Sequence, residues 1–158
     1  MMVSTVRGHF GRFEGSIEAA PDYHDSRVRG TVETASIDTD EPRRDEHLRS
    51  EDFFDAERYP TISFGSTGIE HLGRGDYRVT GELDMHGETR PVTLDVTVHG
   101  AIRDPDGQDR VGLEVRGTIS RSEFGLRWQR LLESGGVAVA DEVRIAADIS
   151  AICTRRDA

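Results

Sequence analysis

The sequence predicts an all-β fold, either an antiparallel barrel or a sandwich, with one or two short helices in the connection over residues 41–59. Apolar and polar side chains alternate with a period of two in seven segments, which indicates strands with one buried face. Short turn sequences join several of these segments, so neighbouring strands should pair antiparallel. The 158 residues give room for one core, and we expect a single domain over residues 1–158.

The first two strands differ in how clearly they are marked. The apolar residues of the first strand are Phe10, Phe13 and Ile17, and their alternation slips phase, which a bulge would explain. Val28 and Val32 mark the second strand without a slip. We therefore expect an irregular first strand and a regular second one.

The pattern then changes between Glu41 and Tyr59. Pro42 stands where a first helical residue would, and the apolar residues that follow it are few among many charges. This composition favours short helices. After the connection, Ile62 and Phe64 begin a third strand that again slips phase before its last apolar residue, Ile69.

Four strands complete the chain, and their apolar stripes are regular. The stripes are Tyr77, Val79, Leu83 and Met85; Val92, Leu94, Val96 and Val98; Val111, Leu113, Val115 and Ile119; and Val143, Ile145 and Ile149. The first turn among these strands is expected at His86-Gly87, and the second at Asp104-Pro105-Asp106-Gly107, because both carry turn residues.

Glycine interrupts several of the stripes near their middle, as at Gly15, Gly30, Gly81 and Gly117. Two interpretations are compatible with this pattern. Glycine relieves strain where the strands of a closed sheet bend, and missing side chains would also leave an apolar lumen for a ligand.

Composition excludes several classes of partner and compartment. The formal net charge is −10, from 30 acidic and 20 basic residues, and it repels nucleic acid and anionic lipid surfaces alike. No stretch is apolar enough for a transmembrane helix, and the first fifteen residues have no apolar region of signal-peptide length. The single cysteine, Cys153, rules out an internal disulfide and fits a reducing compartment, so we expect a cytoplasmic protein.

Catalytic and metal-binding patterns are absent from the sequence. The six histidines never fall at the spacing of metal ligands, no nucleophile elbow is present, and lysine does not occur. We expect no catalytic residues, no metal and no cofactor. Arginine could still bind an anionic headgroup, and the candidates are Arg44, Arg121 and Arg127, although surface ion pairs would equally explain such clusters.

The segment from Phe124 to Leu132 is too apolar for an ordinary loop. It carries Phe124, Trp128 and three leucines, and Gly135-Gly136 follows it. We expect it to cover a core or the mouth of a cavity, as a flap hinged at the two glycines.

Several blocks of the sequence resemble the YceI-like family of bacterial lipid-binding proteins, in the same order along residues 3–150. They are Gly8-His-Phe-Gly-Arg-Phe-Glu-Gly15, Ser36-Ile-Asp-Thr39, Arg44-Asp-Glu-His-Leu48 continuing to Phe53-Phe-Asp55, Tyr59-Pro-Thr-Ile-Ser-Phe64, Gly81-Glu-Leu-Asp-Met-His-Gly87 with Arg90-Pro-Val92, and Ser120-Arg-Ser-Glu-Phe-Gly125. Each block is weak alone, and their shared order makes the resemblance specific.

The resemblance implies an antiparallel up-and-down, lipocalin-like barrel of eight strands around a long isoprenoid chain, and no catalytic residues. Family members carry one more strand before the position of Met1, whereas seven strands are recognisable here. We therefore expect a gap in the barrel, with the strand inside Gly8–Ala19 beside it, and a homodimer that covers unpaired edges.

The first functional hypothesis is a non-enzymatic protein that binds, sequesters or transports an isoprenoid lipid of the polyprenyl pyrophosphate or quinone type, with no other cofactor. The expected lumen residues are Phe13, Val28, Val32, Phe64, Val79, Leu83, Val96, Val98, Val115, Ile119 and Ile145, with Phe124 and Trp128 at the mouth. The alternatives are an enzyme acting on a small amphipathic or lipidic substrate and an interaction module with a filled core.

Overall fold

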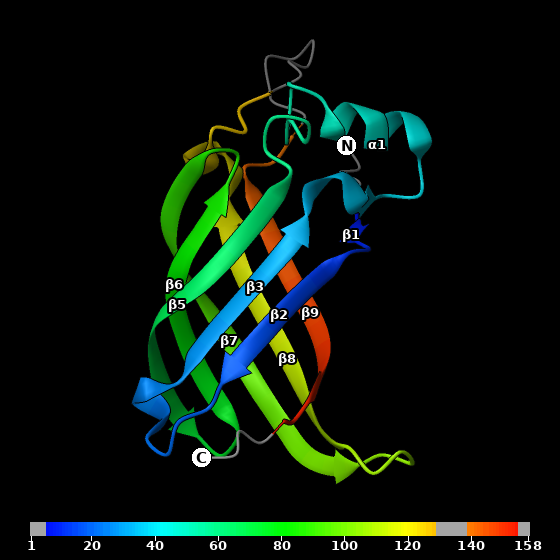
Figure 1. Ribbon diagram of the computed structural model, residues 1–158. Helices are drawn as coiled ribbons and strands as arrows, with labels where there is room; N and C mark the ends of the chain where they lie inside the picture. The colour runs from blue at the N-terminus through cyan, green and yellow to red at the C-terminus, as the bar shows by residue number, and fades with distance from the viewer. Residues whose placement is uncertain (1–5, 129–138, 155–158) are drawn as a thin grey trace, which may run out of the picture.

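The computed structural model describes residues 6–128 and 139–154, and within them the chain forms a curled, antiparallel sheet, a half-barrel (Figure 1). Its elements are β1 (His9–Phe10), β2 (Phe13–Glu18), η1 (Tyr23–Asp25), β3 (Arg27–Glu33), η2 (Thr34–Ser36), β4 (Ile37–Asp38), α1 (Pro42–Arg49), β5 (Thr61–Gly73), β6 (Asp76–Met85), β7 (Glu88–Arg103), β8 (Asp109–Ser120), η3 (Arg121–Phe124) and β9 (Glu142–Ile152). The large sheet has seven strands in the order β2-β3-β5-β6-β7-β8-β9, and β1 pairs with β4 in a second, small sheet. The predicted antiparallel β fold with seven recognisable strands is confirmed.

Strand β6 shows how the alternation becomes structure. Val79 and Met85 are buried at 3% and 4% exposure, whereas Glu82 and Asp84, which lie between them on the chain, are exposed. The strand ends at the two-residue turn of His86 and Gly87, whose φ angles are 58° and 75°. Two successive residues with positive φ give the backbone twist that a tight hairpin needs, and this turn is confirmed as predicted.

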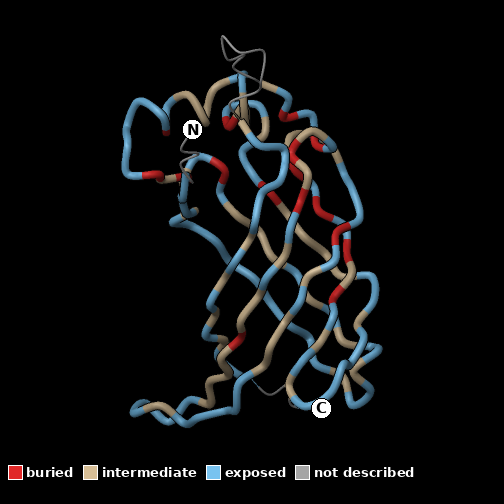
Figure 2. The backbone as a smooth tube through the Cα atoms, turned by 180° about the vertical axis from the view of Figure 1, so that it is seen from behind, coloured by how far each residue is buried: buried red, intermediate tan, exposed pale blue. Residues whose placement is uncertain are grey.

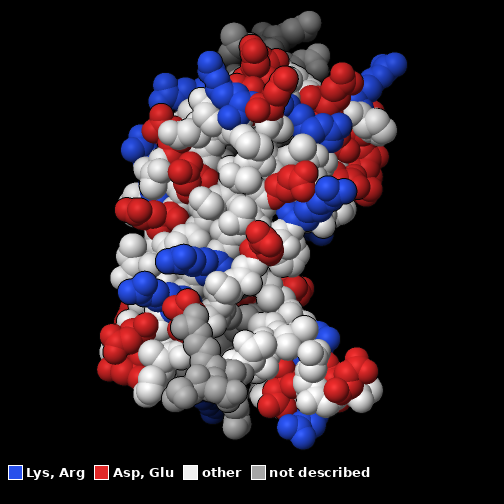
Figure 3. All heavy atoms as spheres, in the orientation of Figure 1, with Lys and Arg blue, Asp and Glu red and all other residues white. Residues whose placement is uncertain are grey.

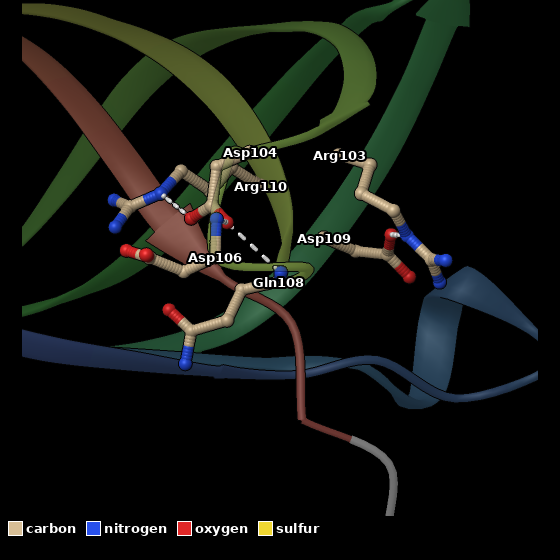
Figure 4. A network of polar contacts seen from close by, with 6 residues as sticks. All are labelled: Arg103, Asp104, Asp106, Gln108, Asp109 and Arg110. Carbon is tan, nitrogen blue, oxygen red and sulfur yellow. Dashed lines mark hydrogen bonds and ion pairs between the residues drawn. The ribbon is translucent and has the colours of Figure 1, made fainter.

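The turn between β7 and β8 is organised by one carboxylate (Figure 4). Asp104 Oδ1 accepts hydrogen bonds from the backbone N–H groups of Asp106 and Gln108, each at 2.9 Å, and Asp104 Oδ2 accepts one from Arg110 Nε at 2.6 Å. Gly107 follows with a φ of 80°. The bond from Arg110 holds the pKa of Asp104 below its usual value.

The two predicted phase slips have different causes. In β5 the register shifts between Ser66 and Gly68, so the expected bulge is confirmed. At the first strand the expectation of a bulge is wrong, because Phe10 belongs to β1 and Phe13 to β2. These two residues lie in separate sheets, and the slip marks the passage from one sheet to the other.

The predicted helical connection contains α1, the one α-helix of the described residues. Pro42 occupies its first turn, and the Glu41 carboxylate caps the N-terminus by accepting from Arg44 N–H. Asp45, buried on this helix, accepts hydrogen bonds from the Thr39 N–H at 2.8 Å and the Thr39 hydroxyl at 2.5 Å. These bonds fix α1 to the chain after β4. Across the described ranges, no helix has the length and apolar character that crossing a membrane requires.

The packed core lies toward one end of the half-barrel. Figure 2 shows most buried segments gathered in the upper part of the molecule. The buried cluster there consists of Ile62, Leu83, Met85, Val92, Ile119, Phe124 and Leu126. Because η3 supplies Phe124 to this cluster, we call this the η3 end, and the opposite end, where η1 contacts β5, the η1 end.

The sheet is open along one side in the described part of the chain. Strands β2 and β9 are its two edges, and no ladder of hydrogen bonds joins them. We call the side between β2 and β9 the seam. The expectation that the strand within Gly8–Ala19 would lie beside a gap is confirmed by the position of β2.

Candidate functional site

The strand register brings the predicted lumen residues of the strands to one face of the sheet. Phe13 lies opposite Val32, Phe64 opposite Leu83, and Val96 opposite Val115, and side chains of directly opposed residues share a face. Continuing the register through each pair places Phe13, Val28, Val32, Phe64, Val79, Leu83, Val96, Val98, Val115, Ile119 and Ile145 together. We call this side the inner face, because the curl of the sheet turns it inward (Figure 1). Their contact with a ligand stays a prediction.

Exposure on the inner face rises toward the seam. The register row that runs from Ile17 across the sheet to Val143 is buried in its middle, where Val92 and Ile119 are 8% and 9% exposed. Its two ends are open, with Ile17 at 46% and Val143 at 39%, and nearby Phe13 at 60%. The inner face is therefore mostly apolar, with Ser66 as the polar residue of this row, and it reaches solvent along the seam.

At two of the four glycines expected to widen a lumen, neighbouring side chains already fill the space. A Cβ added at Gly81 would lie 2.5 Å from Phe64 Cζ and would also clash with the backbone oxygen of Gly65. A Cβ at Gly117 would lie 2.6 Å from Leu94 Cδ2. At these positions the lumen interpretation is wrong, because missing side chains make room for Phe64 and Leu94. Gly30 differs, since the nearest atom to its added Cβ is 4.0 Å away.

The apolar segment after η3 covers the η3 end. Phe124 is 1% exposed and Leu126 is 4% exposed, and both pack into the buried cluster, so this end is filled by protein side chains. Trp128 is half-buried, with its ring 5.2 Å from that of Phe53 and 4.9 Å from that of His47, centre to centre. The rest of the expected flap, with Leu131, Leu132 and Gly135-Gly136, lies outside the described residues.

The three headgroup arginines have different surroundings. Arg121 is 5% exposed, and its Nε, Nη1 and Nη2 donate to the carbonyl oxygens of Ala140, Leu126 and Val139. This guanidinium joins the residues that follow η3 to those that precede β9, and its three nitrogens are engaged by the protein itself. The headgroup assignment of Arg121 is therefore replaced by a structural one.

Arg44 and Arg127 are exposed. Arg44 donates from Nε to the Thr39 hydroxyl at 2.9 Å and from Nη2 to the Thr39 carbonyl at 2.8 Å, which ties it to the same residue as Asp45. Arg127 makes one long bond, 3.5 Å from its Nε to the Ser122 carbonyl. Of the three candidates, Arg127 keeps the most donors for an external anion.

Three carboxyl groups of the described residues have clearly shifted pKa values, all downward. Hydrogen bonds from the Thr39 hydroxyl lower the pKa of Asp45, and those from Ser120 and Ser122 lower the pKa of Asp141. With Asp104, each of these groups is an ionised acceptor at a turn or helix. None has the raised pKa that suits a general acid or base at neutral pH.

A group of four rings at the η1 end was missed by the sequence analysis. Tyr23 and His24 come from η1, His71 from β5 and Tyr77 from β6. The ring centres of His71 and Tyr77 are 4.8 Å apart and nearly parallel, and Tyr23 contacts both at 5.7 and 6.2 Å. We call these residues the ring cluster. Tyr77 belongs to a recognised stripe, but nothing in the sequence placed η1 beside it.

Metal ligands are not grouped anywhere in residues 6–128 and 139–154, where no three His, Cys, Asp or Glu residues lie close enough to hold an ion. Figure 3 shows acidic and basic side chains intermixed over one face of the molecule, with uncharged residues between them. That face carries no continuous basic patch. What distinguishes the molecule is the apolar inner face.

The antiparallel fold and its apolar inner face define the molecule as an all-β, lipocalin-like half-barrel. The chain belongs to the YceI-like family, because the family's YceI-like domain matches residues 1–151. It is 33% identical over 149 residues to a UPF0312 protein of Staphylococcus aureus, an alignment that covers 93% of this chain and 84% of the relative. A UPF0312 protein of Vibrio cholerae is 35% identical over 125 residues, covering 78% of this chain and 66% of the relative.

Solved structures share the fold. The YceI protein of Campylobacter jejuni has 25% identity and a TM-score of 0.82, covering 98% of this chain and 89% of its own. BcnA of Burkholderia cenocepacia has 28% identity and a TM-score of 0.77, covering 91% and 86%. A polyisoprenoid binding domain from Saccharophagus degradans, at 18% identity and a TM-score of 0.53, covers 75% and 67% and shares the fold alone.

Proposed function

We propose that this protein binds an isoprenoid lipid along its inner face, for sequestration or transport, without chemical conversion. The observation that carries the proposal is the mostly apolar inner face, which opens to solvent along the seam at Phe13 and Ile17 on β2 and at Val143 on β9. Covering such a surface with hydrocarbon is favourable by about 25 cal/mol per Å² of apolar area removed from water. The ligand is of the polyprenyl pyrophosphate or isoprenoid quinone type.

Family membership supports the proposal, and so does a fold shared with a domain described as polyisoprenoid binding. The shifted carboxyl groups support the non-enzymatic part, because catalytic sites generally show acids or bases tuned toward neutral pH. Asp45, Asp104 and Asp141 are instead bonded into turns and a helix end. In this arrangement Trp128 would lie beyond the η3 end of the half-barrel, which protein side chains fill, and would not contact the bound lipid.

The experiment is organic extraction of the purified protein followed by mass spectrometry, on wild type and two variants. Val115→Gln places an amide on the inner face. Arg116→Gln is the control, because it introduces the same glutamine at the next position, which lies on the outer face. We expect wild type and Arg116→Gln to retain an isoprenoid and Val115→Gln to lose most of it. Equal retention by all three folded proteins, or no isoprenoid in any of them after incubation with a polyprenol, would overturn the proposal.

We further propose a cytoplasmic homodimer. The two open sheet edges support association, because unpaired strand edges and exposed apolar side chains are commonly covered by a partner. The single, exposed Cys153 supports a reducing compartment. Alkylation of the thiol in freshly lysed cells tests the compartment, with a free thiol expected and an intermolecular disulfide contradicting it.

A further inference from the structure

Strand β9 is the longer of the two edges of the sheet, and one of its sides is unpaired. Its 11 residues, Glu142–Ile152, pair with β8 on one side in an unbroken register. The other side faces the seam, where no described strand pairs with it. Proline and bulges commonly keep an edge strand from pairing, and β9 contains neither. This edge is therefore open to a further strand.

The hydrogen bonds at the two ends of the β8–β9 ladder show which residues of β9 face the seam. The Arg121 N–H donates to the Asp141 carbonyl at 2.9 Å, and the Cys153 N–H donates to the Asp109 carbonyl at 2.8 Å. Along an antiparallel strand, residues that bond to one neighbour alternate with residues that point away from it. The odd-numbered residues of β9 therefore bond to β8. The even-numbered residues, whose side chains are on the outer face, direct N–H and C=O groups into the seam, and they are Glu142, Arg144, Ala146, Asp148, Ser150 and Ile152.

Strand β2, the other edge, presents residues of the opposite face to the seam. The Glu33 N–H donates to the Arg12 carbonyl at 3.0 Å, so the odd-numbered residues of β2, from Phe13 to Ile17, point away from β3. These are residues of the inner face. Directly opposed residues of an antiparallel pair share a face, so β9 of one copy could pair with β2 of another only if their inner faces lay on opposite sides. Two β9 strands match, because both present residues of the outer face.

The charges on the outer face of β9 are self-complementary. Arg144 and Asp148 lie at equal distances along the strand on the two sides of Ala146. A twofold axis at Ala146 would place Arg144 of each copy opposite Asp148 of the other. A shift of the axis by one or two residues in either direction places Asp148 opposite an uncharged residue or places like charges opposite each other. The charges thus favour one register for a pair of β9 strands.

Asp148 has no cation beside it in its own copy. The residue opposite it on β8 is Glu114, and like charges directly opposed destabilise a sheet. Glu114 pairs with Arg116 and with His99 Nε2 at 3.7 Å, whereas no described side chain forms an ion pair with the Asp148 carboxylate. The Arg144 side chain is 88% exposed, and its ion pair within its own strand is long, at 3.7 Å. A second copy would supply the cation that Asp148 lacks.

Resting on the homodimer of the proposed function, we infer that two copies join through their β9 strands, antiparallel about a twofold axis at Ala146. On the outer face, Arg144 of each copy pairs with Asp148 of the other, and the backbones of residues 142–150 exchange hydrogen bonds. The second copy's strand lies in the seam, which Ile17 of β2 borders with 46% exposure. Strand β2 offers the weaker edge for this purpose, because it has 6 residues and its only charged residues are two glutamates.

Charge reversal followed by sedimentation equilibrium tests the register. Arg144→Asp and Asp148→Arg each place like charges opposite one another on both sides of the axis, and each should weaken the dimer by about tenfold or more. An equimolar mixture of the two variants should form a heterodimer of wild-type affinity, because every reversed charge then meets its opposite. The double variant Arg144→Asp/Asp148→Arg should dimerise by itself for the same reason.

Arg29→Asp is the matched control, because Arg29 is exposed on the outer face of β3, which lies inside the sheet rather than at an edge. It should leave dimerisation unchanged. Single reversals that leave a wild-type dimer intact, or a mixture of folded variants that stays monomeric, overturn the β9 assignment while the homodimer itself stands. A wild-type chain that is monomeric throughout the concentration range overturns both.

Discussion

Three inner-face glycines that look alike in the sequence differ in the space around them. An added Cβ at Gly81 meets a rigid ring and a backbone oxygen, at Gly117 the flexible end of Leu94, and at Gly30 nothing within ordinary contact. We expect Gly81→Ala to lower the free energy of unfolding by about 1–3 kcal/mol, Gly117→Ala by less, and Gly30→Ala to be neutral or stabilising. Urea unfolding of the three variants checks this order, and an equal loss at Gly30 and Gly81 would contradict it.

Asp104 gives a pH dependence with a defined sign. Its pKa is lowered in the folded state by the bond from Arg110, so its stabilising contribution is present above the unfolded pKa of about 3.9 and is lost as the pH falls through the lower folded value. Asp104→Asn should therefore reduce stability at pH 7, and its difference from wild type should shrink below about pH 4.

Thermal unfolding between pH 7 and pH 3 measures this difference. Asp106→Asn is the control for the Asp104 prediction, because Asp106 joins the network through its backbone N–H, which the substitution retains. A penalty for Asp104→Asn that stays constant across the pH range would show that the ionised carboxylate is not what stabilises the turn.

The sequence could not predict the surroundings of Arg121, which lies beside the aromatic Phe124. An arginine beside an aromatic segment has the composition of a headgroup site, but here the carbonyl oxygens of Leu126, Val139 and Ala140 engage the guanidinium. Those acceptors are backbone atoms, and no residue type signals them. Their positions are set by the fold, which brings Leu126 after η3 and Val139 and Ala140 before β9 to the same guanidinium.

At the scale of elements, the contact between Phe53 and Trp128 joins the turns that follow α1 to the segment that follows η3. The chain has one tryptophan, so its emission reports the surroundings of this indole, which include Phe53 and His47. Phe53→Ala should shift the emission of Trp128 to longer wavelength, because the indole loses part of its cover. Phe54→Ala is the matched control: Phe54 packs against Phe10 instead, so the emission should stay at the wild-type wavelength.

Most strands were predictable because one face of each is buried, and the alternation survives even where a bulge shifts the register, as in β5. The slip at Phe10 and Phe13 was misread, since a change of sheet and a bulge produce the same pattern in the sequence. The ring cluster was missed for a related reason: η1 lies far from Tyr77 along the chain, and only the folded connection brings Tyr23 to it.

At the scale of the whole molecule, the exposed apolar edges predict self-association. Ile17 on β2 faces the seam and is 46% exposed, so a charge there should oppose a partner's approach without entering the packed core. We expect wild type to sediment as a dimer and Ile17→Lys as a monomer with an unchanged circular dichroism spectrum. A wild-type protein that sediments as a monomer at all concentrations would refute the dimer.

The order of the sheet also determines how the half-barrel responds to its contents. Each strand of the large sheet runs opposite to its neighbour. Because the sheet has seven strands, an odd number, the first strand, β2, and the last, β9, run in the same direction. Two parallel edges cannot form the antiparallel pairing that joins all the other neighbours, and in the described chain no ladder of hydrogen bonds crosses the seam. Spreading β2 from β9 therefore breaks no backbone hydrogen bond between the described strands. If the protein binds a lipid as proposed, the thickness of that lipid, rather than a closed ring of strands, would set the width of the half-barrel.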